Sequence, residues 1–354
     1  MSERDALHAR IAGAITSGIA PAERDRLLFE VARFQVGASP VFARLCRARK
    51  VELGAGPVAP DAWPAVATDT FRFARVATWD DPSLDVRTFR TSGTTSGARG
   101  VHALRDLSLY DLAAERAARD FLFGPRRMRL AMLAPHPDEA PDSSLSYMLG
   151  RFEHWFGTET AWCWRDGALE LDALRVALDA SVRSVEPLAL LGTSFALVHA
   201  DDMLAISERW ELPPGSLAMP TGGFKGRSRE VDPAGMRALL AGRFGLDPER
   251  EIVGEYGMTE LSSQMYEVGG ELRVPEWVRA TPVDPDTLRP VPEGEPGILR
   301  IDDLANLDTA VSIQTADLAR VGPQGRLELV GRAPGATPRG CSLAVEEALG
   351  RSTR

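Results

Sequence analysis

The chain has 354 residues, of which 44% are hydrophobic and 26% are charged. Both values are close to the globular average, which excludes long disorder and leaves enough apolar material for about two domains. Asp and Glu number 50 against 41 Lys and Arg, and the net charge of −9 argues against a general nucleic-acid-binding surface.

The three cysteines, Cys46, Cys163 and Cys341, are too few and too scattered for a disulfide framework or a zinc site. The N-terminus is charged, and no apolar run approaches the length of about 18 residues that a membrane span needs. We therefore expect a cytoplasmic protein without a signal peptide or a membrane span.

The first third of the chain predicts helices, a connecting loop and then the start of an α/β pattern. Residues 1–50 have helical apolar spacing, and Gly54–Pro64 is rich in proline and glycine. The next segments predict a strand at Val86–Arg90 and a helix at Leu104–Phe123.

Further along, strands alternate with helices, which predicts a parallel or mixed sheet covered on both faces. A helical stripe runs from Leu171 to Val182, and a helical segment precedes or follows each later strand. The expected strands are Arg129–Ala134, Leu188–Gly192, Leu217–Thr221 and Glu251–Tyr256. From about residue 270 the pattern changes to short strands with Gly/Pro turns, closed by a helix at Ser342–Leu349.

The predicted fold class is therefore α/β with a small C-terminal β-rich subdomain. We expect a helical segment and linker at 1–65 and an α/β core at 66–268. Residues 269–354 would form the β-rich subdomain and tail.

A glycine-rich loop is the sharpest local signal. It lies between a predicted strand and a predicted helix, where backbone N–H groups, hydroxyls and the helix N-terminus can bind a phosphate. It lacks the Gly-Lys-Ser/Thr ending of a Walker A loop, and on composition alone a flexible surface turn explains it equally well. The candidate phosphate-binding residues are Thr91, Ser92, Gly93, Thr94, Thr95, Ser96, Gly97 and Arg99.

The residue order of this loop resembles the TSGTTGxPKG phosphate loop of the adenylate-forming superfamily, which includes acyl-CoA synthetases, peptide-synthetase adenylation domains and luciferases. Ser96 stands for a glycine, Ala98 for the proline and Arg99 for the lysine. The resemblance implies an adenylate-forming N-terminal domain that uses ATP and Mg²⁺.

Further motifs follow in the family's order. Gly222 and Gly223 resemble the segment that lies against adenine, and Glu255-Tyr256-Gly257-Met258-Thr259-Glu260 resembles the YGxTE motif. By resemblance, Tyr256 stacks on adenine, Thr259 contacts the α-phosphate and Glu260 helps to hold Mg²⁺. Asp317 and Arg332 would both reach the ribose.

Most relatives carry about a hundred further residues, a mobile lid with a catalytic lysine. We expect no such lid here, which points to the narrower acyl-protein synthetases of the LuxE type. The segments Ala140–Leu149 and Gly331–Glu347 are similar to that family. By resemblance, the acyl group passes from AMP to Cys341 and then to a partner such as an acyl reductase or an acyl carrier.

Two side chains have independent chemical arguments and plain alternatives. Cys341 precedes a predicted helix and follows Arg339, both of which favour the thiolate; alternatively it packs beside the helix. Lys225 is one of only two lysines and lies beside the predicted adenine site, so it could replace the lid lysine. An ordinary solvated loop lysine explains it equally well.

The function that these motifs predict is activation of a carboxylic acid, most simply a fatty acid, as an acyl-adenylate, followed by transfer to Cys341. Two alternatives stay open. The adenylate could pass directly to an amine, thiol or hydroxyl acceptor, or the chain could be a nucleotide-binding scaffold without activity. The acid's chain length and the oligomeric state are not indicated.

Overall fold

The computed structural model describes residues 1–54, 63–91, 99–222 and 231–333. These residues form two compact units. The first contains Met1–Arg116, Met258–Ser263 and the described residues from Val274 onward. The second contains Ala117–Gly257 and Gln264–Arg273.

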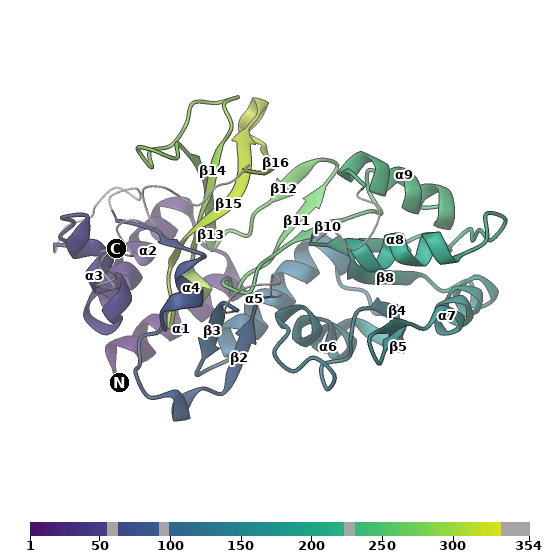
Figure 1. Ribbon diagram of the computed structural model, residues 1–354, viewed down its shortest axis with the longest axis horizontal. Helices are drawn as coiled ribbons and strands as arrows, with labels where there is room; N and C mark the ends of the chain where they lie inside the picture. The colour runs from purple at the N-terminus through teal and green to yellow at the C-terminus, as the bar shows by residue number, and fades with distance from the viewer. Residues whose placement is uncertain (55–62, 92–98, 223–230, 334–354) are drawn as a thin grey trace, which may run out of the picture. The chain divides into compact units, whose positions relative to one another are not determined.

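The second unit is built on a seven-stranded mixed sheet with the order β12-β11-β10-β9-β8-β4-β5 (Figure 1). The strands from β5 to β10 are parallel, and β11 and β12 are antiparallel. This agrees with the predicted α/β pattern. The strands are β4 (Met128–Leu133), β5 (Gly157–Trp162), β8 (Leu188–Thr193), β9 (Leu217–Thr221), β10 (Gly254–Tyr256), β11 (Met265–Val268) and β12 (Glu271–Arg273).

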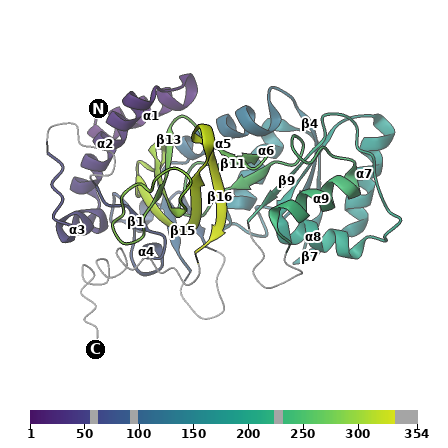
Figure 2. The same cartoon turned by 90° about the horizontal axis from the view of Figure 1, so that it is seen from above.

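Helices cover both faces of this sheet. Alternate side chains of β4 and β8 pack against leucines of α7 (Leu171–Ser184), α8 (Ser194–Met203) and α9 (Pro233–Phe244). Figure 2 shows α6 (Ser144–Phe156) on the side opposite α8 and α9. On that side Phe123 stacks on Phe156 with ring centroids 4.4 Å apart. A short hairpin of β6 (Trp164–Arg165) and β7 (Ala168–Leu169) precedes α7.

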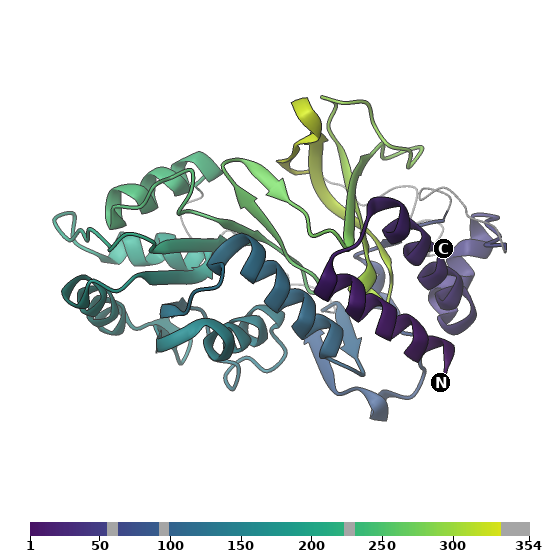
Figure 3. The ribbon, with the colours of Figure 1, turned by 180° about the vertical axis from the view of Figure 1, so that it is seen from behind.

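The first unit begins with the predicted helices, α1 (Glu3–Ser17), α2 (Pro21–Ala38) and α3 (Pro40–Ala48). Local chemistry sets their starts, because Ser2 and Asp5 form a capping box on α1 and the Ser39 hydroxyl caps α3. Seen from behind in Figure 3, the purple helices α1 and α2 pack as a pair.

The sheet of the first unit has the order β1-β15-β14-β13, with β16 also paired to β15. Only β1 is parallel to its neighbour, and the predicted β-rich C-terminal region is confirmed for the described residues. The strands are β1 (Val66–Ala67), β13 (Val278–Val283), β14 (Gly297–Asp303), β15 (Ser312–Val321) and β16 (Leu327–Arg332). Short helical turns lie at α4 (Thr70–Phe73), Pro82–Leu84, Leu304–Asn306 and Pro323–Gly325.

One expectation about the glycine-rich loop was wrong. The loop does not join a strand to a helix, because its flanks are the antiparallel strands β2 (Arg87–Arg90) and β3 (Val101–Leu104). Helix α5 (Ser108–Ala118) begins only after β3 and ends in a π-helical turn at Arg119–Phe123. A four-residue strand running into a helical stripe leaves no local signal of its own, so the expected helix was placed too early.

The two compact units also differ from the predicted domains, whose boundaries were placed after residues 65 and 268. Both the N-terminal helices and the C-terminal strands lie in the first unit, since β1 pairs with β15. Most of the expected Gly54–Pro64 loop and the expected helix at Ser342–Leu349 lie outside the described residues. No helix in the part of the chain that the structure describes combines the length and apolar character needed to cross a membrane.

Candidate active site

The neck of the glycine-rich loop is closed by hydrogen bonds between its two ends. The Thr91 amide donates to the Gly100 carbonyl (3.0 Å), and the Gly100 amide donates to the Thr91 hydroxyl (2.8 Å). A side chain at Gly100 would press on Thr91 and Phe71, with its Cβ only 3.0 Å from Thr91 Cγ2. The loop residues Ser92, Gly93, Thr94, Thr95, Ser96 and Gly97 lie outside the described residues.

Arg99 is exposed at this neck, where its guanidinium donates to main-chain carbonyls. The partners are Thr91 O at 2.6 Å and Arg90 O at 3.2 Å. The side chain therefore braces the hairpin end, and contact with a phosphate remains a prediction.

The segment 258–263, which carries Thr259 and Glu260, is held by hydrogen bonds from buried polar side chains. His102 Nδ1 lies 2.5 Å from the Thr259 carbonyl, and Asn306 Nδ2 donates to the Glu260 carbonyl at 3.0 Å. Asp303 accepts from the amides of Ser262 (3.2 Å) and Ser263 (2.9 Å). Four main-chain polar groups of the segment, on Thr259, Glu260, Ser262 and Ser263, are thus held by side chains from other elements.

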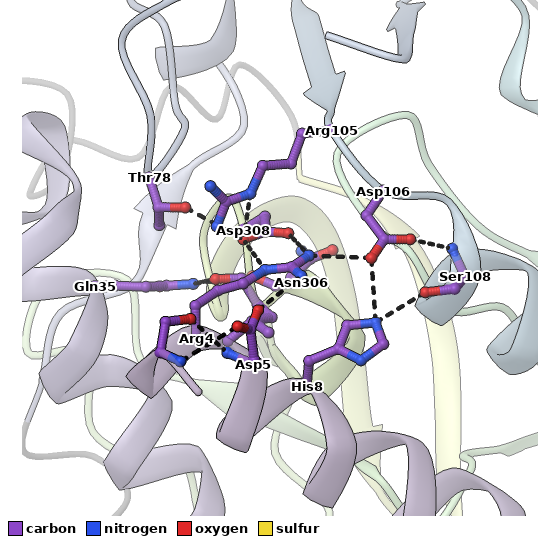
Figure 4. Close-up of polar contacts among 12 residues, drawn as sticks. Arg4, Asp5, His8, Gln35, Thr78, Arg105, Asp106, Ser108, Asn306 and Asp308 are labelled. Carbon is purple, nitrogen blue, oxygen red and sulfur yellow. Dashed lines mark hydrogen bonds and ion pairs between the residues drawn. The ribbon is translucent and has the colours of Figure 1, made fainter. Parts of the chain in front are cut away.

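Asn306 belongs to a loop, residues 304–311, that is itself held by hydrogen bonds and ion pairs from other elements. The Gln35 amide of α2 donates to the carbonyls of Asn306 and Leu307, each at 2.9 Å. Asp308 accepts from Arg4 and Arg105 in the ion-pair cluster of Figure 4, with Arg105 Nη2 2.8 Å away. The loop is therefore tied to α1, α2 and the end of β3.

Glu260 has a buried carboxyl group in an acidic setting. Burial raises the pKa of Glu260 to about 7, and the nearby carboxylates of Asp69 and Asp317 act in the same direction. Within the described part of the chain, the charge of Arg332 acts in the opposite direction and lowers this pKa. A carboxyl that is costly to ionise without a cation nearby suits a cation-binding role.

Asp317 and Arg332, the predicted ribose residues, lie opposite each other on the neighbouring strands β15 and β16. They are directly paired in the register of β15 and β16, and Arg332 Nε lies 3.7 Å from Asp317 Oδ1. The Arg332 side chain is 79% exposed, so its guanidinium stays accessible to a ligand.

In the second unit, the predicted adenine residues lie at the carboxyl ends of neighbouring parallel strands. Thr221 ends β9 and Tyr256 ends β10, with Thr221 and Glu255 paired in register. Carboxyl ends of parallel strands are the usual ligand edge of such sheets. Gly222 follows with φ +66°, and its carbonyl accepts from the Ser194 hydroxyl at 2.8 Å.

Glu255 lies beneath the turn that follows Tyr256. Its carboxyl accepts a hydrogen bond from the Thr221 hydroxyl, and burial raises the pKa of Glu255 to about 7. A Cβ at Gly257 would collide with this carboxyl, so a larger residue there would force the Glu255 side chain to move. Tyr256, Met258 and Thr259 are half-buried.

Three predicted residues, Gly223, Lys225 and Cys341, lie outside the described residues. The other two cysteines are buried, as expected of core residues. Burial raises the pKa of the Cys46 thiol to about 11 and that of Cys163 to about 12, so neither is a ready nucleophile.

Sequence reasoning missed the supporting residues of the site, namely His102, Asp303 and Asn306. They act on segment 258–263 from distant positions in the chain, and no short-range spacing links them to it. Two weak signals were available: His102 closely follows the glycine-rich loop, and Asp303 and Asn306 are polar residues at the end of an apolar strand.

Comparison with known families adds to this geometry. The model of the family described as acyl-protein synthetase, LuxE, matches residues 26–350. The chain belongs to this family. It is therefore a ligase of the acyl-protein synthetase type.

Two curated relatives support the assignment at lower identity. Both are long-chain-fatty-acid–luciferin-component ligases. The one from Vibrio harveyi is 24% identical over 84% of this chain and 81% of its own length. The one from Aliivibrio fischeri is 24% identical over 94% of this chain and 90% of its own length.

The acyl-protein synthetase is also similar in fold to solved adenylate-forming ligases. A 2-hydroxyisobutyryl-CoA ligase in complex with 2-HIB-AMP, in the postadenylation state, matches 88% of this chain and 68% of its own, with a TM-score of 0.63 and 15% identity. An open conformation of that ligase, with 2-HIB-AMP and CoA, matches with a TM-score of 0.60 and 16% identity, over 88% of this chain and 75% of its own. At these identities the likeness supports the fold class.

Proposed function

We propose that the protein activates a carboxylic acid, most simply a long-chain fatty acid, with ATP and transfers the acyl group to Cys341. The observation that carries the proposal is the family match over residues 26–350, which contains every nucleotide motif in the adenylate-forming order. The names of the two curated relatives support a fatty acid as the substrate class.

In the first step the acid's carboxylate oxygen attacks the α-phosphorus of ATP, and pyrophosphate leaves. Loop 91–100 and the Thr259 hydroxyl would hold the phosphates, and Tyr256 would stack on adenine. Asp317 would accept from the ribose hydroxyls, with Arg332 beside it. Such a step depends on positioning and charge neutralisation more than on a general base.

Magnesium fits this donor set through Glu260. The described residues contain no group of three candidate ligand side chains. A magnesium ion bound with ATP is usually held by one or two carboxylates together with the nucleotide phosphates. When bound, the ion supplies charge neutralisation at the phosphates, and the Glu260 carboxylate would be its protein ligand.

In the second step a thiolate attacks the acyl carbon, forming a thioester and releasing AMP. Cys341 is proposed as this nucleophile because Cys46 and Cys163 are buried with raised thiol pKa values. Lys225 is proposed to contact the reacting carboxylate or α-phosphate in place of a lid lysine. An acyl reductase or acyl carrier would then take the acyl group.

The test is the intact mass of the protein after incubation with Mg-ATP and acids ranging from acetate to long-chain fatty acids. We expect a hydroxylamine-labile acyl adduct that Cys341→Ser abolishes and the control Cys46→Ala retains. Lys225→Ala should slow pyrophosphate release, and an unchanged rate would remove Lys225 from the mechanism.

Other outcomes identify the alternatives. Pyrophosphate release without an adduct would place the acyl acceptor on another molecule, an amine, thiol or hydroxyl compound. Nucleotide binding without pyrophosphate release would indicate a scaffold and would contradict the proposed function.

A further inference from the structure

His102 lies where three parts of the first unit meet. It is on β3, two residues after Gly100 at the neck of the glycine-rich loop, and is paired in register with Phe89 of β2. Its ring reaches the Thr259 carbonyl on one side and the Thr309 hydroxyl on the other. Nothing in the recognised nucleotide motifs includes it.

The hydrogen bonds of the ring define its protonation. A carbonyl oxygen only accepts, so Nδ1 carries the proton and donates to Thr259 O at 2.5 Å. Nε2 then accepts from the Thr309 hydroxyl, 3.2 Å away. Complete burial lowers the pKa of His102 to about 4, so the ring stays neutral and keeps this tautomer across the physiological range.

A neutral, fully buried and fully paired imidazole does not serve as an acid or a base. Its position gives it a different use. The hairpin that carries the loop is rigid through four register pairs, and segment 258–263 is otherwise held by Asp303 and Asn306. The bond from Nδ1 to the Thr259 carbonyl is a direct side-chain link between the hairpin and the segment.

We propose that His102 is a positioning residue that fixes Thr259 relative to the neck of the glycine-rich loop, so that both bind the same nucleotide phosphates during adenylation. The inference rests on the proposed function. The inference adds a positioning residue to that reaction, and it predicts that Nδ1 of the ring is the nitrogen that positions Thr259.

The ring's two nitrogens can be separated by substitution. In His102→Asn the amide Nδ2 lies close to the position of the ring Nδ1 and can still donate to Thr259 O. In His102→Gln the longer amide lies near Nε2 and keeps only the Thr309 contact. His102→Leu keeps neither contact and leaves the buried carbonyl unpaired.

The main measurement is pyrophosphate release with Mg-ATP and the acid that acylates the protein. We expect kcat to fall at least about tenfold in His102→Leu and His102→Gln, since a small misplacement can cost about a hundredfold. The KM for the acid should stay near its wild-type value, and His102→Asn should restore most of the rate.

A stability control separates positioning from loss of fold. Trp63→Phe removes the buried hydrogen bond from Trp63 Nε1 to Ser312 Oγ (2.7 Å), which lies in the same unit and joins residues outside segment 258–263. It should lower the melting temperature comparably and leave kcat unchanged. Equal loss of kcat in this control and in His102→Leu would overturn the proposal, as would wild-type kcat in His102→Gln.

Hydrogen exchange of the amides of residues 259–263 gives a readout that does not need activity. Exchange should accelerate in His102→Leu and His102→Gln but not in His102→Asn; equal exchange in all three would overturn the proposal. If the wild-type protein released no pyrophosphate while this exchange pattern held, the proposed function would fail and the positioning of Thr259 by His102 would stand.

Discussion

At the scale of the residue, three of the carboxyl groups described above are buried and have unusual pKa values. Glu255, Glu260 and Asp303 all have raised pKa values, and burial is the largest cause in each case. Ser262, Ser263 and Ala305 donate hydrogen bonds to Asp303, whereas among the described residues Glu255 accepts from the Thr221 hydroxyl alone. Of these two carboxyl groups, Glu255 therefore receives fewer hydrogen bonds that stabilise its ionised form.

The pH dependence of stability follows from this contrast. The pKa of Glu255 is about 7 in the folded protein against an ordinary value of 4.5. The folded state therefore binds more protons between these values, and the free energy of unfolding falls as the pH rises from about 4.5 to 7. Above pH 7 the loss is complete, at about 3 kcal/mol at most.

Glu255→Gln isolates this effect because the uncharged amide still accepts from Thr221. We expect the variant to match the wild type near pH 4.5 and to be more stable at pH 8 in urea unfolding. Glu260 and Asp303 titrate alike in both proteins, so they cancel in the difference. Among the described residues no charged group contributes to the raised pKa of Glu255, and parallel pH profiles of the two proteins would contradict that raised pKa.

At the scale of the element, helix α2 holds loop 304–311 through hydrogen bonds of one side chain. Gln35 is completely buried, donates to two carbonyls of the loop and accepts from the Val311 amide at 2.9 Å. One amide side chain thus satisfies three main-chain groups of buried residues.

Gln35→Leu should lower the free energy of unfolding by about 3 kcal/mol, because a similar volume stays buried while three polar groups lose their partner. Urea unfolding of the two proteins measures the difference. Arg33→Ala, at an exposed position of the same helix, should change stability by less than about 0.5 kcal/mol. A Gln35→Leu variant as stable as Arg33→Ala would show that the loop holds its shape without α2.

Elements with strong local patterns could be predicted from sequence, and those defined by distant pairing could not. The parallel strands β4, β8 and β9 were found because each is an apolar run between helical stripes. Strand β3 was missed because only its pairing with β2 distinguishes Val101–Leu104 from the first turn of a helix. The motif Tyr256–Glu260 was located at a strand end as expected, but its supports His102 and Asn306 are single polar residues far away in the chain.

At the scale of the whole molecule, each compact unit is built from segments that are far apart in the sequence. The first unit takes in both the N-terminal helices and the C-terminal strands, together with the six residues Met258–Ser263. Thr259, Glu260, Asp317 and Arg332 belong to this unit, and Glu255 and Tyr256 to the second.

Mg-ATP should stabilise the whole chain by mass action, by about 2.7 kcal/mol at a concentration one hundred times its Kd. We expect the melting temperature to rise with Mg-ATP and to rise less with ATP and a chelator. Glu260→Gln should remove the magnesium-dependent part of that shift, because the amide is a weaker ligand for a hard cation. The exposed carboxylate control Glu249→Gln should keep the full shift. A magnesium-dependent shift that survives in Glu260→Gln would assign the cation to other groups, and no shift with either nucleotide form would contradict ATP as the substrate.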